Sequence, residues 1–339
     1  MDFSVNGNPL GMPEAAEQAL REAIQHVGEY PDITANALTE AVSRMLSGEC
    51  GRAIPGEYLL FGNGASELFL AIVHALKPRN IVIPVPSFYG YGYAAEAADS
   101  HIKYVYLSEE TGFCPGKELL QALTPDTDLL LLANPNNPTG QLMNREYLYQ
   151  LLEHCRQRGI VVVLDECFIE FCETDGEPSK SLLGKMRQYD NLVLVRAFTK
   201  SFAMPGVRLG YLVCGNAELR EKISRQLPEW NLSVFAQRAG IVCAEQAEHY
   251  LRDTVEYVKK ERTYLRERLE KRGIRVVSGE ADFLLLHTTQ PIYDRLLQKG
   301  ILIRDCENFR GLGVGYYRIA VKTHAENEIL LQELKSCLS

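Results

Sequence analysis

One lysine stands among small and apolar side chains in the stretch FTKSFAMPGVRLGYL, residues 198–212. Lys200 is flanked by Thr199 and Ser201, and the next charged residue is Arg208. A lysine held in poor solvent loses its proton readily and can then act as a nucleophile that forms a Schiff base. The alternative is an ordinary surface lysine on a loop, so other parts of the chain must decide between the two.

The segment FGNGASELF has the pattern of an anion site. Its glycines, Gly62 and Gly64, leave backbone amides bare, and a predicted helix begins near Ala65 and Ser66. Bare amides, a hydroxyl and a helix N-terminus together bind anions such as phosphate. An ordinary glycine-rich turn, with Ser66 as the helix cap, is the alternative interpretation.

Two polar groups follow apolar runs that we predict to be buried strands. The loop NPNNPTG, residues 134–140, places Asn136 or Asn137 where an amide could meet a ligand, although a rigid turn is also consistent with it. Asp165 ends the run VVVLD, where a carboxylate is costly unless it is paired, hydrogen-bonded or in a solvated cleft; a solvent-facing acid is the alternative. The carboxyl ends of strands form the ligand crevice in open α/β sheets, so these positions matter more than others.

The elements that must position these groups alternate along the chain. Short runs rich in Val, Ile and Leu predict buried strands within 80–87, 128–136, 159–167, 191–199 and 209–215. Amphipathic segments lie between these runs, which predicts an α/β fold with a mostly parallel sheet between helices. After residue 225, a long helix over 244–271 precedes strands that alternate apolar and polar residues. This second pattern predicts a smaller α+β domain with a partly exposed sheet.

Composition and charge argue against several classes of protein. The chain has 339 residues and a net charge of −8, without the basic stripe of a nucleic-acid-binding protein. Its nine cysteines form no C-x-x-C pair, so we expect neither a disulfide framework nor a metal site. There is no signal pattern and no run of about 18 apolar residues, so we expect a cytoplasmic protein without membrane contact.

Taken together, the candidate groups match the needs of one cofactor, pyridoxal 5'-phosphate. That cofactor requires a phosphate cup, a donor to its phenolic oxygen, an acid that keeps the ring nitrogen protonated, and a lysine. The ordered motifs GNGASE, PSFY, NPNNPTG, DECF, TK and RLG resemble those of fold type I pyridoxal-phosphate enzymes of the class I/II aminotransferase family, over essentially the whole chain.

The resemblance implies the fold and its division into domains. It implies the PLP-dependent transferase fold, in which a large cofactor-binding domain with a mostly parallel sheet accompanies a smaller α+β domain. We expect the large domain over 36–225 and the small domain, with its linking helix, over 226–339. Residues 1–35 are expected to form an N-terminal arm that belongs to the small domain and contacts a second subunit.

The resemblance also implies a role for each matching residue. Lys200 is expected to form the internal aldimine, Asp165 to pair with the pyridine nitrogen, and Asn137 to bind the phenolic oxygen. The ring is expected to stack on Phe88. The residues expected to hold the cofactor phosphate are Ala65, Ser66, Thr199 and Arg208.

Tyr30, in the segment EYPD, matches a tyrosine that reaches the cofactor phosphate of the neighbouring subunit. The resemblance therefore implies a homodimer with shared active sites. Two positions depart from the family pattern. Phe168 replaces a tyrosine that donates to the phenolic oxygen in many members, so we expect a raised pKa for the lysine imine. Ala197 replaces a hydroxyl that commonly faces the phosphate, which is expected to weaken the cup slightly.

Within the family, the sequence is most similar to the threonine-phosphate decarboxylases of cobalamin biosynthesis and to the histidinol-phosphate aminotransferases. In that branch Arg304 and Arg318 are both directed at the substrate, and two fixed guanidinium groups suit a carboxylate and a phosphate. We expect decarboxylation of a phosphorylated amino acid like L-threonine O-3-phosphate, through an external aldimine. The alternative is a histidinol-phosphate type of aminotransferase, because the angle that selects the broken bond is not fixed by sequence.

The start of the sequence bears on the substrate. The decarboxylases compared begin with a further segment that carries a histidine and paired glycines near the substrate phosphate, whereas this sequence starts at MDFSVNGNPLG. We expect either that Asn6, Asn8 and Lys322 replace that segment, or that the substrate differs, with serine phosphate and histidinol phosphate as candidates. Two weaker alternatives are a regulator's sensing domain and a nucleotide-binding oxidoreductase, for which GNGASE lacks the third glycine.

Overall fold

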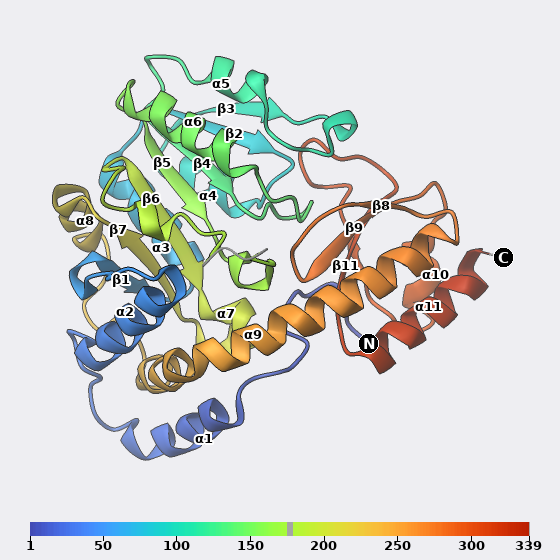
Figure 1. The fold of residues 1–339 in the computed structure, drawn as a ribbon, viewed down its shortest axis with the longest axis horizontal. Helices are drawn as coiled ribbons and strands as arrows, with labels where there is room; N and C mark the ends of the chain where they lie inside the picture. The colour runs from blue at the N-terminus through green and yellow to red at the C-terminus, as the bar shows by residue number, and fades with distance from the viewer. Residues whose placement is uncertain (175–178, 339) are drawn as a thin grey trace.

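The structure, a computed structural model, describes residues 1–174 and 179–338. Two sheets lie at opposite ends of the molecule, and the long helix α9, Val234–Glu270, runs alongside both (Figure 1). Within the described residues, no helix combines the length and the apolar character needed to cross a bilayer.

The larger sheet has seven strands in the order β1-β7-β6-β5-β4-β2-β3. All neighbouring pairs are parallel except those that β7 makes with β1 and β6. The strands are β1 Leu59–Gly62, β2 Asn80–Val85, β3 His101–Tyr106, β4 Leu129–Ala133, β5 Val161–Asp165, β6 Leu192–Ala197 and β7 Gly210–Cys214. The five strands predicted from apolar runs are confirmed, and the mostly parallel sheet with them. The prediction missed β1, which is short, and β3, an edge strand whose residues are largely exposed.

Helices cover both faces of this sheet. Successive residues of one strand belong to different cores, because side chains alternate across a sheet: Leu130 and Leu132 of β4 pack in one hydrophobic cluster, whereas Leu129 and Leu131 pack in another. The helices of this part of the chain are α1 Glu14–Ala23, α2 Asn36–Cys50, α3 Ala65–Leu76, α4 Gly90–Glu96, α5 Lys117–Ala122, α6 Arg145–Arg156, α7 Phe198–Ser201 and α8 Ala217–Ser224. Double coverage explains why the central strands are continuous apolar runs.

Helix α9 begins ten residues earlier than the predicted 244–271. The Ser233 side chain accepts a hydrogen bond from the backbone N–H of Ala236 and so caps the helix. Its first turns contain Ala239 and Gly240, which are buried against the large sheet's helices. This part of the helix lacks the charged face on which the prediction rested.

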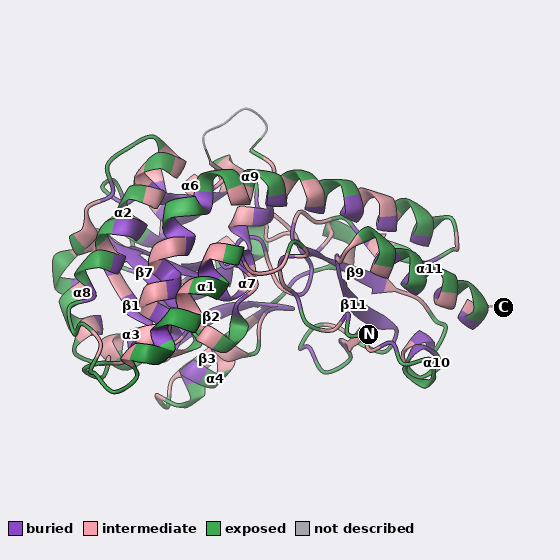
Figure 2. Ribbon diagram, turned by 90° about the horizontal axis from the view of Figure 1, so that it is seen from below, coloured by how far each residue is buried: buried purple, intermediate pink, exposed green. Residues whose placement is uncertain are grey.

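The smaller sheet has four antiparallel strands in the order β10-β11-β9-β8. These are β8 Arg275–Val277, β9 Phe283–His287, β10 Arg304–Asp305 and β11 Tyr316–Ala320, and helices α10 Ile292–Gln298 and α11 His324–Leu338 accompany them. The expected partly exposed sheet is wrong for β9 and β11, which are almost completely buried (Figure 2). One face packs against α9, α10 and α11, while the other packs against residues of the larger part of the chain.

The amino-terminal residues connect the two sheets. The Phe3 amide donates to the carbonyl of Leu302 over 2.7 Å, and the Phe3 carbonyl accepts from the Ala320 amide over 2.8 Å. Five residues later, the Asn8 amide donates to the carbonyl of Lys200 over 3.1 Å. Phe3 packs in the core of the small sheet. The predicted domain boundaries stay a prediction, and their ranges include 175–178 and 339, which lie outside the described residues.

Candidate active site

Lys200 lies in the short helix α7, directly after the carboxyl end of β6. Its Nζ donates a hydrogen bond to the carbonyl oxygen of Asn6 over 3.2 Å. Burial lowers the pKa of Lys200, the Asp282 carboxylate opposes this shift, and the Arg318 guanidinium adds to it. The surface-lysine interpretation therefore does not fit, because this amine is part-buried and is more easily deprotonated than an ordinary lysine.

Asp165 ends β5, where the sequence predicted a ligand crevice, and it is buried. Its Oδ2 accepts a hydrogen bond from the Tyr91 hydroxyl over 2.6 Å, and its Oδ1 accepts one from the Cys167 amide over 2.9 Å. Burial raises the pKa of Asp165, and these two hydrogen bonds lower it. The solvent-facing alternative for Asp165 is thus wrong.

Sequence reasoning missed Tyr91, which is buried in α4 and packs edge-on against the ring of Phe88 at 5.6 Å. The only signal was its place three residues after Phe88 in PSFYGYGY. Two tyrosines next to it in that segment, Tyr89 and Tyr93, are exposed, so residue type alone does not single out Tyr91.

The start of α3 is an open set of backbone amides. Gly64 occupies the N-cap position with φ 79°, and no side chain caps the helix, so the alternative in which Ser66 is the cap is wrong. The Nη2 atom of Arg208 donates to the Asn63 carbonyl over 3.1 Å, and a Cβ on Gly64 would lie 2.6 Å from that nitrogen. The amides of Ala65 and Ser66 and a guanidinium therefore meet at one helix N-terminus, which is a phosphate-binding arrangement.

Three further positions singled out in the sequence are buried. Thr199 is buried in α7 beside Lys200. Ala197 and Phe168, the two departures from the family pattern, belong to one apolar cluster, against which Ala65 packs. Phe168 also meets the ring of Phe283 edge-on at 5.1 Å. Both positions therefore present apolar side chains to this part of the site.

Arg304 and Arg318 are cross-strand partners on β10 and β11. Arg318 is buried, its Nη1 donates to Asn137 Oδ1 over 2.5 Å, and its Nη2 donates to the Ser4 carbonyl over 3.0 Å. Its Nε has no hydrogen-bond partner among the described residues. Burial lowers the pKa of Arg318. Arg304 donates to Asn308 Oδ1 over 2.8 Å. The strand pairing of Arg304 with Arg318, and the hydrogen bond from Arg318 to Asn137, place these three residues next to one another.

The three residues expected to replace the histidine segment, Asn6, Asn8 and Lys322, are not equivalent. The Asn8 amide group donates to the Ser201 carbonyl and to Thr254 Oγ1, so it is already engaged. The Lys322 amine pairs with Glu326 over 3.5 Å. Asn6 is buried, and its Oδ1 has no hydrogen-bond partner among the described residues. Asn6 is the one whose side chain is open to a ligand.

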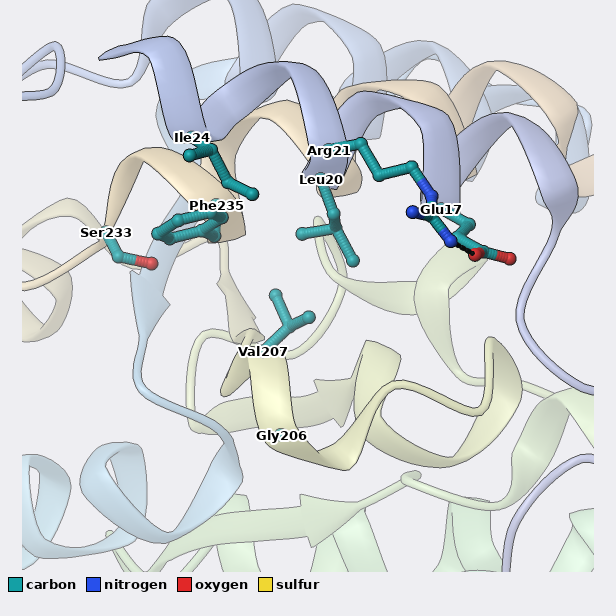
Figure 3. Close-up of a pocket in the computed structure, with 8 residues that line it drawn as sticks. All are labelled: Glu17, Leu20, Arg21, Ile24, Gly206, Val207, Ser233 and Phe235. Carbon is teal, nitrogen blue, oxygen red and sulfur yellow. Dashed lines mark hydrogen bonds and ion pairs between the residues drawn. The ribbon is translucent and has the colours of Figure 1, made fainter. Parts of the chain in front are cut away.

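Tyr30 is the predicted site residue that the structure does not bring to the others. Its side chain is 84% exposed, and its ring lies 5.1 Å from that of Trp230. A groove runs between α1, the turn at residues 205–207 and the start of α9 (Figure 3). The groove is lined largely by apolar side chains, including Leu20, Ile24, Val207 and Phe235, and by none of the predicted site residues.

A family model described as aminotransferase class I and II matches residues 1–334. The chain belongs to this family. It is 34% identical to the threonine-phosphate decarboxylase of Salmonella typhimurium, over all of this chain and 91% of that protein. It is 33% identical to the histidinol-phosphate aminotransferase of Symbiobacterium thermophilum, over 98% of this chain and 89% of that protein.

Among solved structures, the histidinol-phosphate aminotransferase from Clostridium acetobutylicum superimposes with a TM-score of 0.90. It is 34% identical and covers all of this chain and 99% of that one. This class I and II member is accordingly an enzyme with the fold of pyridoxal-phosphate-dependent aminotransferases, as the sequence predicted.

Enzymes of this family depend in general on pyridoxal phosphate, and the residues present fit that group. The uncapped start of α3 beside Arg208 offers donors for a phosphate. The buried acid Asp165 and the amine of Lys200, with its lowered pKa, meet two further requirements of that cofactor. The Nε of Arg318 and the Oδ1 of Asn6 are buried polar atoms that the described protein leaves unpaired, as expected where a polar ligand binds.

Proposed function

We propose that this class I/II family member binds pyridoxal phosphate and decarboxylates a phosphorylated amino acid of the L-threonine O-3-phosphate type. The observation that carries the proposal is the pairing of Arg304 with Arg318 on adjacent strands, where Arg318 is close enough to Lys200 to lower the pKa of its amine. Two guanidinium groups at fixed positions match a substrate that has both a carboxylate and a phosphate. The similarity to threonine-phosphate decarboxylase over the whole chain supports the same substrate class.

The proposed cofactor-binding residues have different roles. Pyridoxal phosphate, when bound, supplies an electron sink for the bond that breaks. Asp165, hydrogen-bonded by the Tyr91 hydroxyl, would hold a proton on the pyridine nitrogen. Asn137 would donate from its NH2 group to the phenolic oxygen, because its amide oxygen already accepts from Arg318. Ala65, Ser66, Thr199 and Arg208 would hold the phosphate, and Phe88 would stack on the ring.

The proposed substrate residues act on the two ends of the substrate. Arg318 binds the carboxylate, for which its unpaired Nε is a ready donor. Arg304 binds the phosphate and Asn6 contributes a polar contact. Lys200 is the group that moves a proton at the substrate Cα, since burial keeps its amine more easily deprotonated than usual.

A second candidate function is transamination of histidinol phosphate or a similar amine. The solved structure with a TM-score of 0.90 and the relative from Symbiobacterium thermophilum both carry that name. The two reactions share the cofactor residues and differ in which substrate bond is aligned for cleavage, which depends on where Arg304 and Arg318 hold the substrate. An aminotransferase needs an oxo acid to complete its cycle, whereas a decarboxylase does not.

We further propose a cytoplasmic homodimer in which Tyr30 reaches the cofactor phosphate of the other subunit. The high exposure of Tyr30, whose ring contacts Trp230, supports this role. Other large apolar side chains of the same part of the sequence, Ile24, Val27 and Ile33, are also exposed, and Ile24 lines the groove of Figure 3. Exposed apolar patches of this kind mark protein–protein contacts.

The test of the function uses the cofactor-loaded protein with L-threonine phosphate, L-serine phosphate and L-histidinol phosphate, each supplied without an oxo acid. Carbon dioxide release over many turnovers from L-threonine phosphate, with the cofactor returning to its lysine-bound form, is the expected result. Conversion of the cofactor to its amine form in a single turnover, without gas, would instead establish the aminotransferase.

A further inference from the structure

Asp282 is a deeply buried carboxylate with few hydrogen-bond donors around it. Its exposed fraction is 0%, and within the described residues neither Oδ1 nor Oδ2 forms a hydrogen bond, although the backbone amides of Gly7 and of Asp282 itself approach it and lower its pKa. Two other buried acids of this region, Asp165 and Glu166, each accept hydrogen bonds from neighbouring donors. Burying a charge without well-formed hydrogen bonds is costly, so a position that keeps an acid in this state needs a functional explanation.

The backbone holds Asp282 firmly at the start of β9. Its carbonyl accepts a hydrogen bond from the Val321 amide over 2.7 Å, in the segment that continues β11. The preceding carbonyl, that of Ala281, accepts from Arg262 over 3.2 Å. The following residue, Phe283, is fixed in the apolar cluster with Phe168. Because both flanks are anchored, the carboxylate cannot turn out into solvent.

The charged groups that face Asp282 are those proposed to do the chemistry. They are Lys200 on α7 and Arg318 on β11, and the backbone amide of Gly7 approaches from the N-terminal arm. Burial raises the pKa of Asp282 to about 6, while Lys200 and Arg318 oppose the rise. Asp282 can therefore change its protonation near neutral pH, which an ordinary aspartate cannot.

The hydrogen bonds that Lys200 and Arg318 donate do not involve Asp282. Lys200 donates to the Asn6 carbonyl, and Arg318 donates to Asn137 and to the Ser4 carbonyl. These acceptors are neutral, and within the described residues Asp282 forms an ion pair with neither cation; its charge acts on both through space and raises the pKa of each. A carboxylate that binds Arg318 from outside would bring a second negative charge into the same buried space.

We propose that Asp282 is a positioning residue that sets the charge of the substrate pocket: it is the resident counter-ion of Arg318, and it takes up a proton when a substrate carboxylate binds there. The inference rests on the proposed function, in which Arg318 receives that carboxylate. Two carboxylates that share one buried site do not both stay ionised, so binding the second drives a proton onto the first. Substrate affinity is then linked to pH through Asp282, and rises as pH falls from 8 toward 6.

The experiment measures the binding of 3-sulfopropanoate to the cofactor-loaded protein by calorimetry between pH 5.5 and 8.5. This probe carries a carboxylate and a permanently ionised sulfonate, but no amine, so it binds without reacting and does not itself titrate in this range. Comparing buffers with different ionisation heats gives the number of protons taken up. Protons gained by Lys200 are counted separately, from the absorbance of the cofactor bound to it, and are subtracted.

For the native protein we expect a proton uptake that exceeds the Lys200 contribution, and an affinity about tenfold weaker at pH 8 than at pH 5.5. Asp282→Asn is expected to lose the excess uptake and to bind with a nearly constant affinity. Asp294→Asn, an exposed residue on α10, removes the same formal charge and is expected to behave as the native protein does.

Three results would overturn the inference, and they separate it from the proposed function. If the native protein binds the probe without excess proton uptake, or if Asp282→Asn keeps the full excess, Asp282 has no such role and the proposed function stands. If the native protein does not bind the probe at all, both the role of Asp282 and the carboxylate site at Arg318 are wrong. A purely structural Asp282 would alter thermal stability on substitution but not the proton count.

Discussion

Replacing Tyr91 by phenylalanine removes one hydroxyl from the site and leaves the ring, which packs against Phe69 and Phe88, in place. The lost group is the donor of the 2.6 Å hydrogen bond to Asp165 Oδ2. The Cys167 amide then remains as the donor to this buried carboxylate. The pKa of Asp165, already raised by burial, is expected to rise further.

The size of the effect follows from the charge on the acceptor. A hydrogen bond to a charged group contributes about 1.5–3 kcal/mol, which corresponds to roughly one to two pKa units. When the pKa of an acid is higher in the folded than in the unfolded protein, the acid stabilises the fold most at pH values below its pKa in the unfolded chain. This stabilisation is lost as the pH rises through its pKa in the folded protein. Tyr91→Phe should therefore destabilise by about 1.5–3 kcal/mol at pH 8 and by only about 1 kcal/mol at pH 4.5, where the carboxyl is more fully protonated.

Urea unfolding of the cofactor-free protein at the two pH values measures this difference. Tyr93→Phe is the matched control, because Tyr93 lies on the same helix with its side chain exposed, and its substitution should change stability by less than about 0.5 kcal/mol at either pH. An equal loss of stability at both pH values for Tyr91→Phe would refute the argument, since it would show that the hydroxyl does not support an ionised Asp165.

The substrate arginines and the subunit contact yield further predictions. Arg304→Gln should reduce the preference for L-threonine phosphate over L-threonine by about 10–100-fold in kcat/KM, the value of one charge-assisted contact; an unchanged preference would exclude Arg304 as the phosphate ligand. Arg318→Gln should weaken 3-sulfopropanoate and substrate alike by a similar factor, measured by calorimetry, and undiminished binding would move the carboxylate site elsewhere. Mixing the inactive variants Tyr30→Ala and Lys200→Ala should restore about a quarter of native activity if subunits exchange in a two-fold dimer with shared sites, whereas no recovery after verified exchange would contradict the role of Tyr30.

The sequence predicted best those strands whose residue pattern indicates both their burial and their extended backbone conformation. The run in β4 is apolar throughout, and those in β5 and β6 are apolar except at the last and next-to-last positions, which is the pattern of strands covered on both faces. Lys200 and Asp165 were singled out as candidates because both follow or end such strands, and the carboxyl ends of strands in open α/β sheets form the ligand crevice. The buried faces of β9 and β11 were not predicted, since their coverage comes from segments far away in the chain.

Buried polar residues mark the limit of sequence reasoning. Arg196 lies inside the apolar strand β6, and its guanidinium pairs with Glu49, Glu166 and Glu170. Nothing local in the sequence identifies those partners, because they come from a separate helix and from the segment after β5. Asp282 was missed for the same reason: before an apolar strand it looks like an ordinary turn acid, and only the fold places Lys200 and Arg318 opposite it.

The central claim is that Lys200 is the amine that carries the cofactor, and chemical trapping tests it most directly. The protein is loaded with pyridoxal phosphate, reduced with borohydride and digested, and mass spectrometry locates the lysine that bears the added mass. The account predicts the mark on Lys200, and predicts that Lys200→Ala remains folded but takes up no mark. A mark on another lysine, or an equal mark in folded Lys200→Ala, would contradict it.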